Sequence, residues 1–139
     1  MNQTIVNSLA GVFGAAFTYA FGAWNELFGL LLLVMAIDYI SGLAASLKEN
    51  KGLSSEVGFW GLWKKGLMLM VIMLGHRADL LLDINIVMYG AIYFYLSNEL
   101  ISVMENYGRM GLPLPKQIKR IIEVLKEREE PPGTPPHDK

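Results

Sequence analysis

The stretch at residues 29–46, GLLLLVMAIDYISGLAAS, decides the fold class of this 139-residue chain. It is apolar almost throughout, and about 20 such residues in a helix span the hydrocarbon core of a bilayer. Its one charged side chain is Asp38. A charge at the bilayer centre costs roughly 2.5 to 3.5 kcal/mol, so Asp38 must pair, become protonated or face water. The stretch therefore predicts a membrane helix with one polar group that needs a partner.

The composition of the whole chain agrees with a membrane protein. Hydrophobic residues make up 53% of the chain and charged residues only 18%. The formal net charge of −1, without a basic region interleaved with aromatic residues, argues against a nucleic-acid partner. Because the chain has no cysteine, disulfides, thiol nucleophiles and thiolate metal sites are excluded.

Four stretches have the length and apolar character of membrane spans, at about residues 5–24, 27–45, 62–82 and 84–104. The short segments WNE and LLDIN connect the first to the second and the third to the fourth. We therefore expect an all-α membrane protein with about four transmembrane helices in two hairpins. The first stretch is rich in glycine and alanine and has no charged anchor at its start. If it lies at the interface instead, three spans remain.

Lys and Arg residues predict the orientation, because short loops rich in them stay on the cytoplasmic side. The basic residues between the two hairpins are Lys48, Lys51, Lys64 and Lys65, and those after the fourth stretch are Arg109, Lys116, Lys119 and Arg120. The two tight turns carry Glu26 and Asp83 instead. We expect a multi-pass protein with a cytoplasmic C-terminus. Four spans would place the N-terminus in the cytoplasm as well, and three would place it outside.

The segment after the last apolar stretch divides the chain into a membrane domain, residues 1–110, a cytoplasmic amphipathic helix, residues 111–130, and a disordered tail, residues 131–139. Pro113 and Pro115 mark the start of this helix. One helical face then carries the apolar residues Ile118, Ile121, Ile122 and Leu125. The tail is polar and rich in proline, a composition typical of disorder.

Small residues follow one face of the first stretch at spacings of three and four. They are Thr4, Ser8, Gly11, Ala15, Thr18 and Gly22. Such a face lets two helix backbones approach closely in lipid. It predicts either packing within the chain or the interface of a homo-oligomer. Gly42 and Ala45 place a similar small surface on the same helical face as Asp38, where another helix can come near.

Three charged side chains are predicted to lie at similar depths. With a rise of about 1.5 Å per residue, Asp38 lies about 3 Å to the cytoplasmic side of the midplane, Glu99 about 7 to 8 Å and Lys65 about 10 Å. Lys65 has a long stem, so the three side chains can meet and act as packing or gating groups. The plainer interpretations are a helix-packing hydrogen bond for Asp38, and an anchor at the membrane surface for Lys64 and Lys65.

The sequence gives no support for catalysis. His76 has no second histidine near it, and GHRAD has neither metal-ligand spacing nor an activated nucleophile. We interpret His76, Arg77 and Asp79 as a solvated helix end. We therefore expect no enzymatic activity, no cofactor and no metal.

Residues 29–127 resemble the phage-lysis and toxin-secretion holins, a family typified by small holins of phages of Gram-positive bacteria. The resemblance is carried by DYISGLAASLKENKGLSSEVGFWGLWKK, by GHRAD at the end of the next apolar helix, and by YGRMGLPLPKQIKRIIEVLKE. Its first element is Asp38 with Gly42 four residues later. The other motif residues are Ser55, Gly58, Gly61, Lys64 and Lys65, followed by Gly111, Leu112, Pro113, Pro115 and Lys116.

The resemblance implies a holin that gathers in the inner membrane of a bacterial host, forms homo-oligomers and opens holes that cause timed lysis. A cell-wall hydrolase (endolysin) or a toxin would leave through the holes without binding the holin directly. The start MNQ lacks the paired methionine and basic residue by which some holins encode an inhibitor, so this timing device is not expected. The sequence leaves two alternatives open: a small multi-span transporter or ion channel, and a membrane adaptor that acts through its C-terminal helix.

Overall fold

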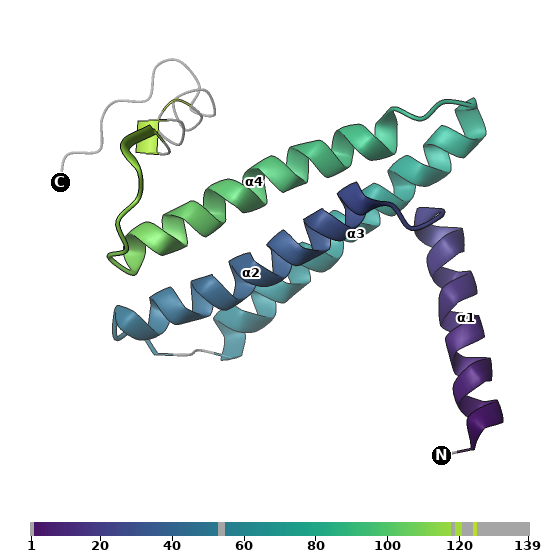
Figure 1. Cartoon of the computed structure of the whole chain (residues 1–139), viewed down its shortest axis with the longest axis horizontal. Helices are drawn as coiled ribbons and strands as arrows, with labels where there is room; N and C mark the ends of the chain where they lie inside the picture. Colours follow the sequence, from purple (N-terminus) through teal and green to yellow (C-terminus); the bar gives the residue numbers. More distant parts are fainter. Residues whose placement is uncertain (1, 53–54, 118, 121–123, 125–139) are drawn as a thin grey trace.

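The computed structural model describes residues 2–52, 55–117, 119–120 and 124. Its long elements are four α-helices: α1 (Gln3–Phe21), α2 (Glu26–Lys48), α3 (Ser55–Leu82) and α4 (Val87–Arg109). Figure 1 shows α2, α3 and α4 side by side in one bundle, with α3 antiparallel to the other two. We call the end with the α3–α4 turn the turn end, and the end with the α2–α3 connection the loop end.

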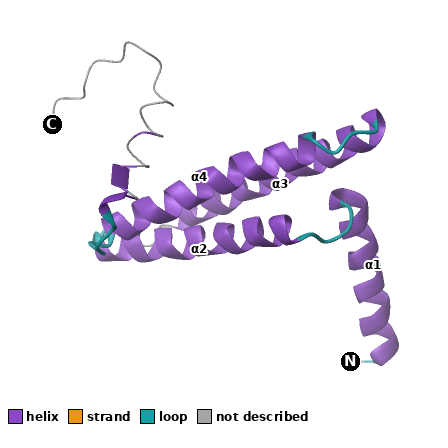
Figure 2. Ribbon diagram, turned by 45° about the horizontal axis from the view of Figure 1, so that its top comes forward, coloured by secondary structure: helices purple, strands orange, loops and turns teal. Residues whose placement is uncertain are grey.

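Helix α1 leaves the bundle at a steep angle, so α1 and α2 are consecutive but do not pack along each other (Figure 2). The chain turns at Gly22, whose φ of 77° favours glycine, and Asn25 then caps α2 by accepting a hydrogen bond from the backbone N–H of Phe28. Helices α3 and α4 do pack as neighbours, but α2 packs mainly against α4. The all-α class is confirmed, whereas the arrangement in two hairpins stays a prediction.

Two of the four helices, α1 and α2, are long and apolar enough to cross a membrane by length and composition. The apolar part of helix α3 is short, because charged residues bound it on both sides, Lys65 on one and Arg77 on the other. Helix α4 contains Asn98 and Glu99 near its middle. Four membrane spans therefore stay a prediction.

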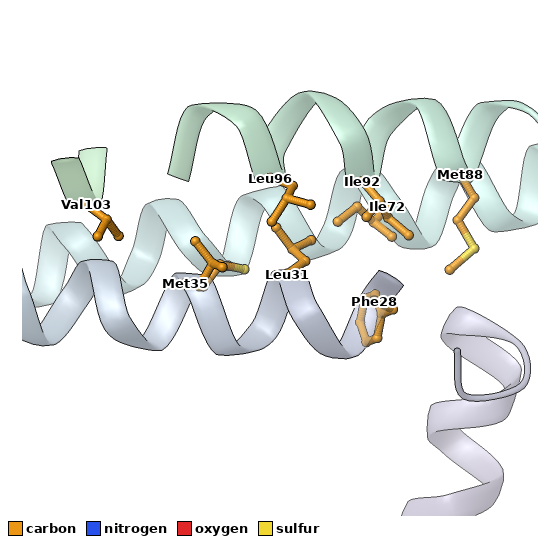
Figure 3. Packing of buried hydrophobic residues seen from close by; sticks show 9 residues of the cluster. Phe28, Leu31, Met35, Ile72, Met88, Ile92, Leu96 and Val103 are labelled. Carbon is orange, nitrogen blue, oxygen red and sulfur yellow. The ribbon is translucent and has the colours of Figure 1, made fainter. Parts of the chain in front are cut away.

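The core of the bundle is an apolar seam between α2, α3 and α4. Its buried members are Phe28, Leu31, Val34, Met35, Ile72, Met88, Ile92, Leu96 and Val103. In Figure 3 the labelled side chains of this set point toward one another from the three helices. Each helix also exposes large apolar side chains on its outer face, such as Leu33, Ile40 and Phe94. An exposed apolar surface of this extent is what a lipid environment accommodates.

Asp79 of α3 fixes the start of α4 at the turn end. Its carboxylate accepts hydrogen bonds from the backbone N–H groups of Ile86 at 3.2 Å, Val87 at 2.9 Å and Met88 at 2.9 Å. These N–H groups have no partner within their own helix, because they belong to its first turn. Asp79 is only 4% exposed. Its predicted place at a solvated helix end is therefore wrong, since the first turn of α4 packs over it.

Gly75 lets the backbones of α3 and α4 approach closely at the same end, because a Cβ there would lie 3.1 Å from the Cα of Met88. We expect Gly75→Ala to lower the free energy of unfolding by about 1 to 3 kcal/mol, the usual cost of overpacking. Gly66→Ala is the matched control, since a Cβ at Gly66 meets nothing within 4 Å. It should be neutral or stabilising, by up to about 1 kcal/mol, because alanine is the better helix former. Thermal unfolding in detergent micelles, followed by circular dichroism, compares the two; equal effects would contradict the close approach.

Candidate functional site

Three charged side chains from three helices meet inside the bundle. The Nζ atom of Lys65 in α3 donates a hydrogen bond to Oδ2 of Asp38 in α2 at 2.8 Å, and another to Oε2 of Glu99 in α4. Lys65 is 9% exposed and Glu99 is 4% exposed. We call Asp38, Lys65 and Glu99 the charge cluster. The sequence predicts that these residues can meet, and the structure places them in contact; their role in gating stays a prediction.

Asn106 and Ser41 extend the charge cluster. Neither residue was predicted from the sequence. The Nδ2 atom of Asn106 donates to Oδ1 of Asp38 at 3.0 Å and to Oγ of Ser41 at 3.1 Å. The Nη1 atom of Arg109 in turn donates to Oδ1 of Asn106 at 3.1 Å. One signal was available: Asn106 follows Glu99 by seven residues, which places both on one face of α4.

Glycines of the motif make room for this polar packing. A Cβ at Gly58 would lie 3.3 Å from the hydroxyl of Tyr39, and one at Gly61 would lie 3.7 Å from its ring. A Cβ at Gly42 would lie 3.5 Å from Nδ2 of Asn106. Gly58 and Gly61 therefore bring α3 close to α2, and Gly42 brings α2 close to α4. Ala45, one turn further along α2, is fully buried.

The lysine pair of the motif divides into two environments. Lys64 is exposed, which agrees with an anchor at the membrane surface, whereas the neighbouring Lys65 points into the bundle. The anchor interpretation is therefore wrong for Lys65. Ser55, at the first position of α3, is exposed.

A groove of about 440 Å³ lies beside the charge cluster, between α2, α3 and α4. Its lining includes the three members of the charge cluster and the polar side chains of Lys64, Asn98, Ser102 and Asn106. Carboxylate, ammonium, amide and hydroxyl groups can hold ordered water. The surface of the groove is mostly apolar, but these polar groups lie next to the charge cluster.

At the loop end, a separate ion pair between Glu49 and Arg109 joins the C-terminal ends of α2 and α4. Arg109 donates from Nε to Oε1 of Glu49 at 2.9 Å and from Nη2 to Oε2 at 3.0 Å. Lys48 donates to the carbonyl of Met110, just before Gly111 turns the chain with a φ of 73°. The hydrogen bonds from Arg109, followed by that from Lys51, lower the pKa of Glu49 from 4.5 to about 2.

This pKa gives a pH dependence that can be measured. Because the pKa of Glu49 is lowered in the folded chain, its stabilising effect should be complete above about pH 4.5 and disappear as the pH falls toward 2. The effect should be small, since the pair is partly exposed. The measurement is the difference in unfolding midpoint between the unmodified protein and Glu49→Gln at several pH values. A difference that does not shrink below pH 4.5 would contradict the assignment.

The small face of α1 divides into a packed and an unpacked part. A Cβ at Gly22 would lie 2.8 Å from Cε1 of His76, so this residue packs within the chain. Arg77 lies 4.4 Å above the ring of Tyr19 and also holds this end of α1. Gly11 and Ala15 are exposed, and a Cβ at Gly11 would meet nothing within 4 Å. A homo-oligomer interface along this part of α1 stays a prediction.

Other predicted features fall at or beyond the edge of the described chain. Pro113 and Pro115 are exposed in the segment after α4. All four residues of the predicted apolar face, Ile118, Ile121, Ile122 and Leu125, and all of residues 131–139 lie outside the described residues. Among the residues that the structure describes, no group of three His, Cys, Asp or Glu side chains could hold a metal ion.

The chain is similar to one family of known proteins. The model of the bacteriophage holin family matches residues 15–127, which include all of α2, α3 and α4. An uncharacterized protein of Halalkalibacterium halodurans is 40% identical over 130 residues, covering 89% of this chain and 96% of the relative. An uncharacterized protein of Listeria innocua is 42% identical over 114 residues, covering 81% of each chain.

A probable holin of Bacillus phage phi105 is 30% identical over 108 residues, covering 77% of this chain and 78% of the phage protein. No solved structure matches the chain. The family and the two apolar helices together identify a membrane protein. By the extent of the match, the chain belongs to the bacteriophage holin family.

Proposed function

We propose that the chain is a holin that accumulates in the cytoplasmic membrane of a bacterial host, forms homo-oligomers and opens holes. An endolysin or a toxin leaves through these holes, and the endolysin then degrades the cell wall. The observation that carries this proposal is a buried charge cluster inside a helical bundle whose exterior is apolar, in a chain of the holin family. Similarity to a probable phage holin supports it further.

The proposed orientation places the loop end of the bundle in the cytoplasm. Three segments far apart in the sequence bring their basic residues to this end: Lys48 and Lys51, Lys64, and Arg109 with the segment that follows it. A concentration of Lys and Arg is retained on the cytoplasmic side. The C-terminus then lies in the cytoplasm.

The charge cluster offers a mechanism for opening. In the closed bundle, Lys65 pairs with both Asp38 and Glu99 within one chain. When helices separate during hole formation, the same side chains would line water. Moving one charge through the membrane field is worth about 2.3 kcal/mol per 100 mV, so a loss of membrane potential would shift the balance toward the open assembly.

Variants that remove these charges test the mechanism. We expect Asp38→Asn and Glu99→Gln each to change the time at which lysis begins and the response of lysis to an uncoupler, because each removes a carboxyl group that pairs with Lys65 in the closed state. Glu56→Gln is the control, since Glu56 is exposed in the first turn of α3. Unchanged onset and unchanged uncoupler response in both cluster variants would refute the charge mechanism.

A narrower pore is the second candidate function, because a groove beside buried charges also suits a small transporter or an ion channel. Release of a cytoplasmic muramidase, co-expressed in bacteria, separates the two. A holin releases the enzyme abruptly into the medium. A transporter or ion channel would dissipate gradients while the enzyme stayed inside the cells, and this result would overturn the proposed function.

A further inference from the structure

The charge cluster contains one more acid than it has bases. Asp38 and Glu99 both pair with Lys65, which is the one cation within 4.0 Å of either carboxylate among the residues that the structure describes. With both acids ionised, the cluster would bury a net negative charge. An uncompensated charge in a low-dielectric interior is costly, and such groups gain a proton instead.

The surrounding groups do not supply the missing positive charge. From α2, the cluster is faced by the hydroxyl groups of Tyr39 and Ser41, which supply no cation. From α3, Lys64 lines the same groove but is exposed. From α4, the guanidinium of Arg109 is engaged by both oxygens of Glu49 and by the amide of Asn106.

The two carboxylates differ in the number of donors that they receive. Asp38 accepts at both oxygens, from Lys65 at 2.8 Å and from Asn106 at 3.0 Å, so a donor occupies each of them. Glu99 accepts a hydrogen bond from Lys65 at Oε2 only. In the described part of the chain, no donor bonds to its Oε1 atom. Glu99 also lines the groove, which is the side from which water would approach this carboxyl group.

We propose that the charge cluster is a proton-binding site that holds one proton per subunit on Glu99 at neutral pH, beside an ionised Asp38 and a charged Lys65. The proton comes from water in the groove and bonds to Oε1, which leaves the cluster electrically neutral. Loss of this proton would restore the buried negative charge and weaken the closed bundle. The binding site itself stands on the geometry alone; its coupling to hole opening rests on the proposed function.

Infrared spectroscopy of the full chain in lipid bilayers tests the site without any assay of holes. Exposed carboxylates are ionised at pH 7 and give no carboxylic-acid C=O band. We expect one such band at pH 7, displaced by 13C labelling of glutamate side chains. Glu99→Gln should abolish it, and Glu56→Gln should leave it unchanged. Circular dichroism of each variant confirms that the helices are retained.

Asp38→Asn makes the test specific for charge balance. Without the second acid, Glu99 and Lys65 form a neutral pair, so the band should disappear from this variant although Glu99 is still present. A band that survives in Asp38→Asn would overturn the charge-balance argument. The site would also be refuted by an unmodified protein without the band, by a band insensitive to glutamate labelling, or by a band that persists in Glu99→Gln. Failure of the muramidase release assay, in contrast, would count against the proposed function and not against this site.

Discussion

Replacement of Lys65 by methionine is expected to lower the free energy of unfolding by about 3 to 5 kcal/mol, which is the usual cost of removing one partner from a buried ion pair. Lys65 is the shared partner of Asp38 and Glu99, and its stem is buried between three helices. Methionine fills a similar volume but donates no hydrogen bond. Two carboxyl groups would then lie together in the interior without a cation.

Lys64→Met is the matched control, because it removes the same charge from the adjacent exposed residue. It should change the free energy of unfolding by no more than about 0.5 kcal/mol. The measurement is thermal unfolding in detergent micelles, together with the level to which each variant accumulates in membranes. Adding Asp38→Asn and Glu99→Gln to Lys65→Met should recover part of the loss. Equal unfolding of Lys65→Met and Lys64→Met would show that the cluster does not stabilise the bundle.

The second large effect is expected at the turn end, where Asp79→Asn should lower the free energy of unfolding by about 2 to 4 kcal/mol. An amide keeps only one acceptor oxygen, and its NH2 group would face backbone donors that the carboxylate now satisfies. Three N–H groups in residues 86–88 depend on this side chain. The N–H group of Met88 is buried, so leaving it unsatisfied is costly, and a hydrogen bond to a charged acceptor is stronger than one to a neutral acceptor.

Asp83→Asn provides the comparison within the same turn. Asp83 is exposed and has a φ of 53°, a conformation that asparagine tolerates well. Its replacement should change stability by no more than about 0.5 kcal/mol. Hydrogen exchange adds a local measurement, because the N–H groups of residues 86–88 should exchange faster in Asp79→Asn alone. Equal exchange in both variants would contradict the capping role of Asp79.

The positions of the helices follow from the apolar pattern, but their ends do not. The second apolar stretch was predicted at residues 27–45, and α2 covers Glu26–Lys48. Helix α3 begins at Ser55, well before the predicted start near residue 62. The sequence before residue 62 was assigned to the connection between the two hairpins. In the structure Gly58 and Gly61 lie inside the helix, where they pack against Tyr39, and a packing partner of this kind is not visible in the local sequence.

The candidate site, like the helices, could be predicted from the sequence only in part. The depths of Asp38, Lys65 and Glu99 along their helices are simple arithmetic, and they favour the contact that the structure contains. The roles of Asn106 and Asp79 depend on which helix faces which, and a spacing rule within one helix does not specify a neighbour. The direction of α1 depends on Gly22 and on its contact with His76, which is equally non-local.

The proposed hole formation is tested most directly with the purified chain in lipid vesicles. Vesicles that contain both a small fluorescent dye and a labelled muramidase are prepared at increasing ratios of protein to lipid, and the release of each probe is followed. We predict that both probes leave together once the ratio passes a threshold, because assembled subunits open a hole wide enough for a folded enzyme. Release of the dye at every ratio while the muramidase stays enclosed would contradict a holin and indicate a narrow channel.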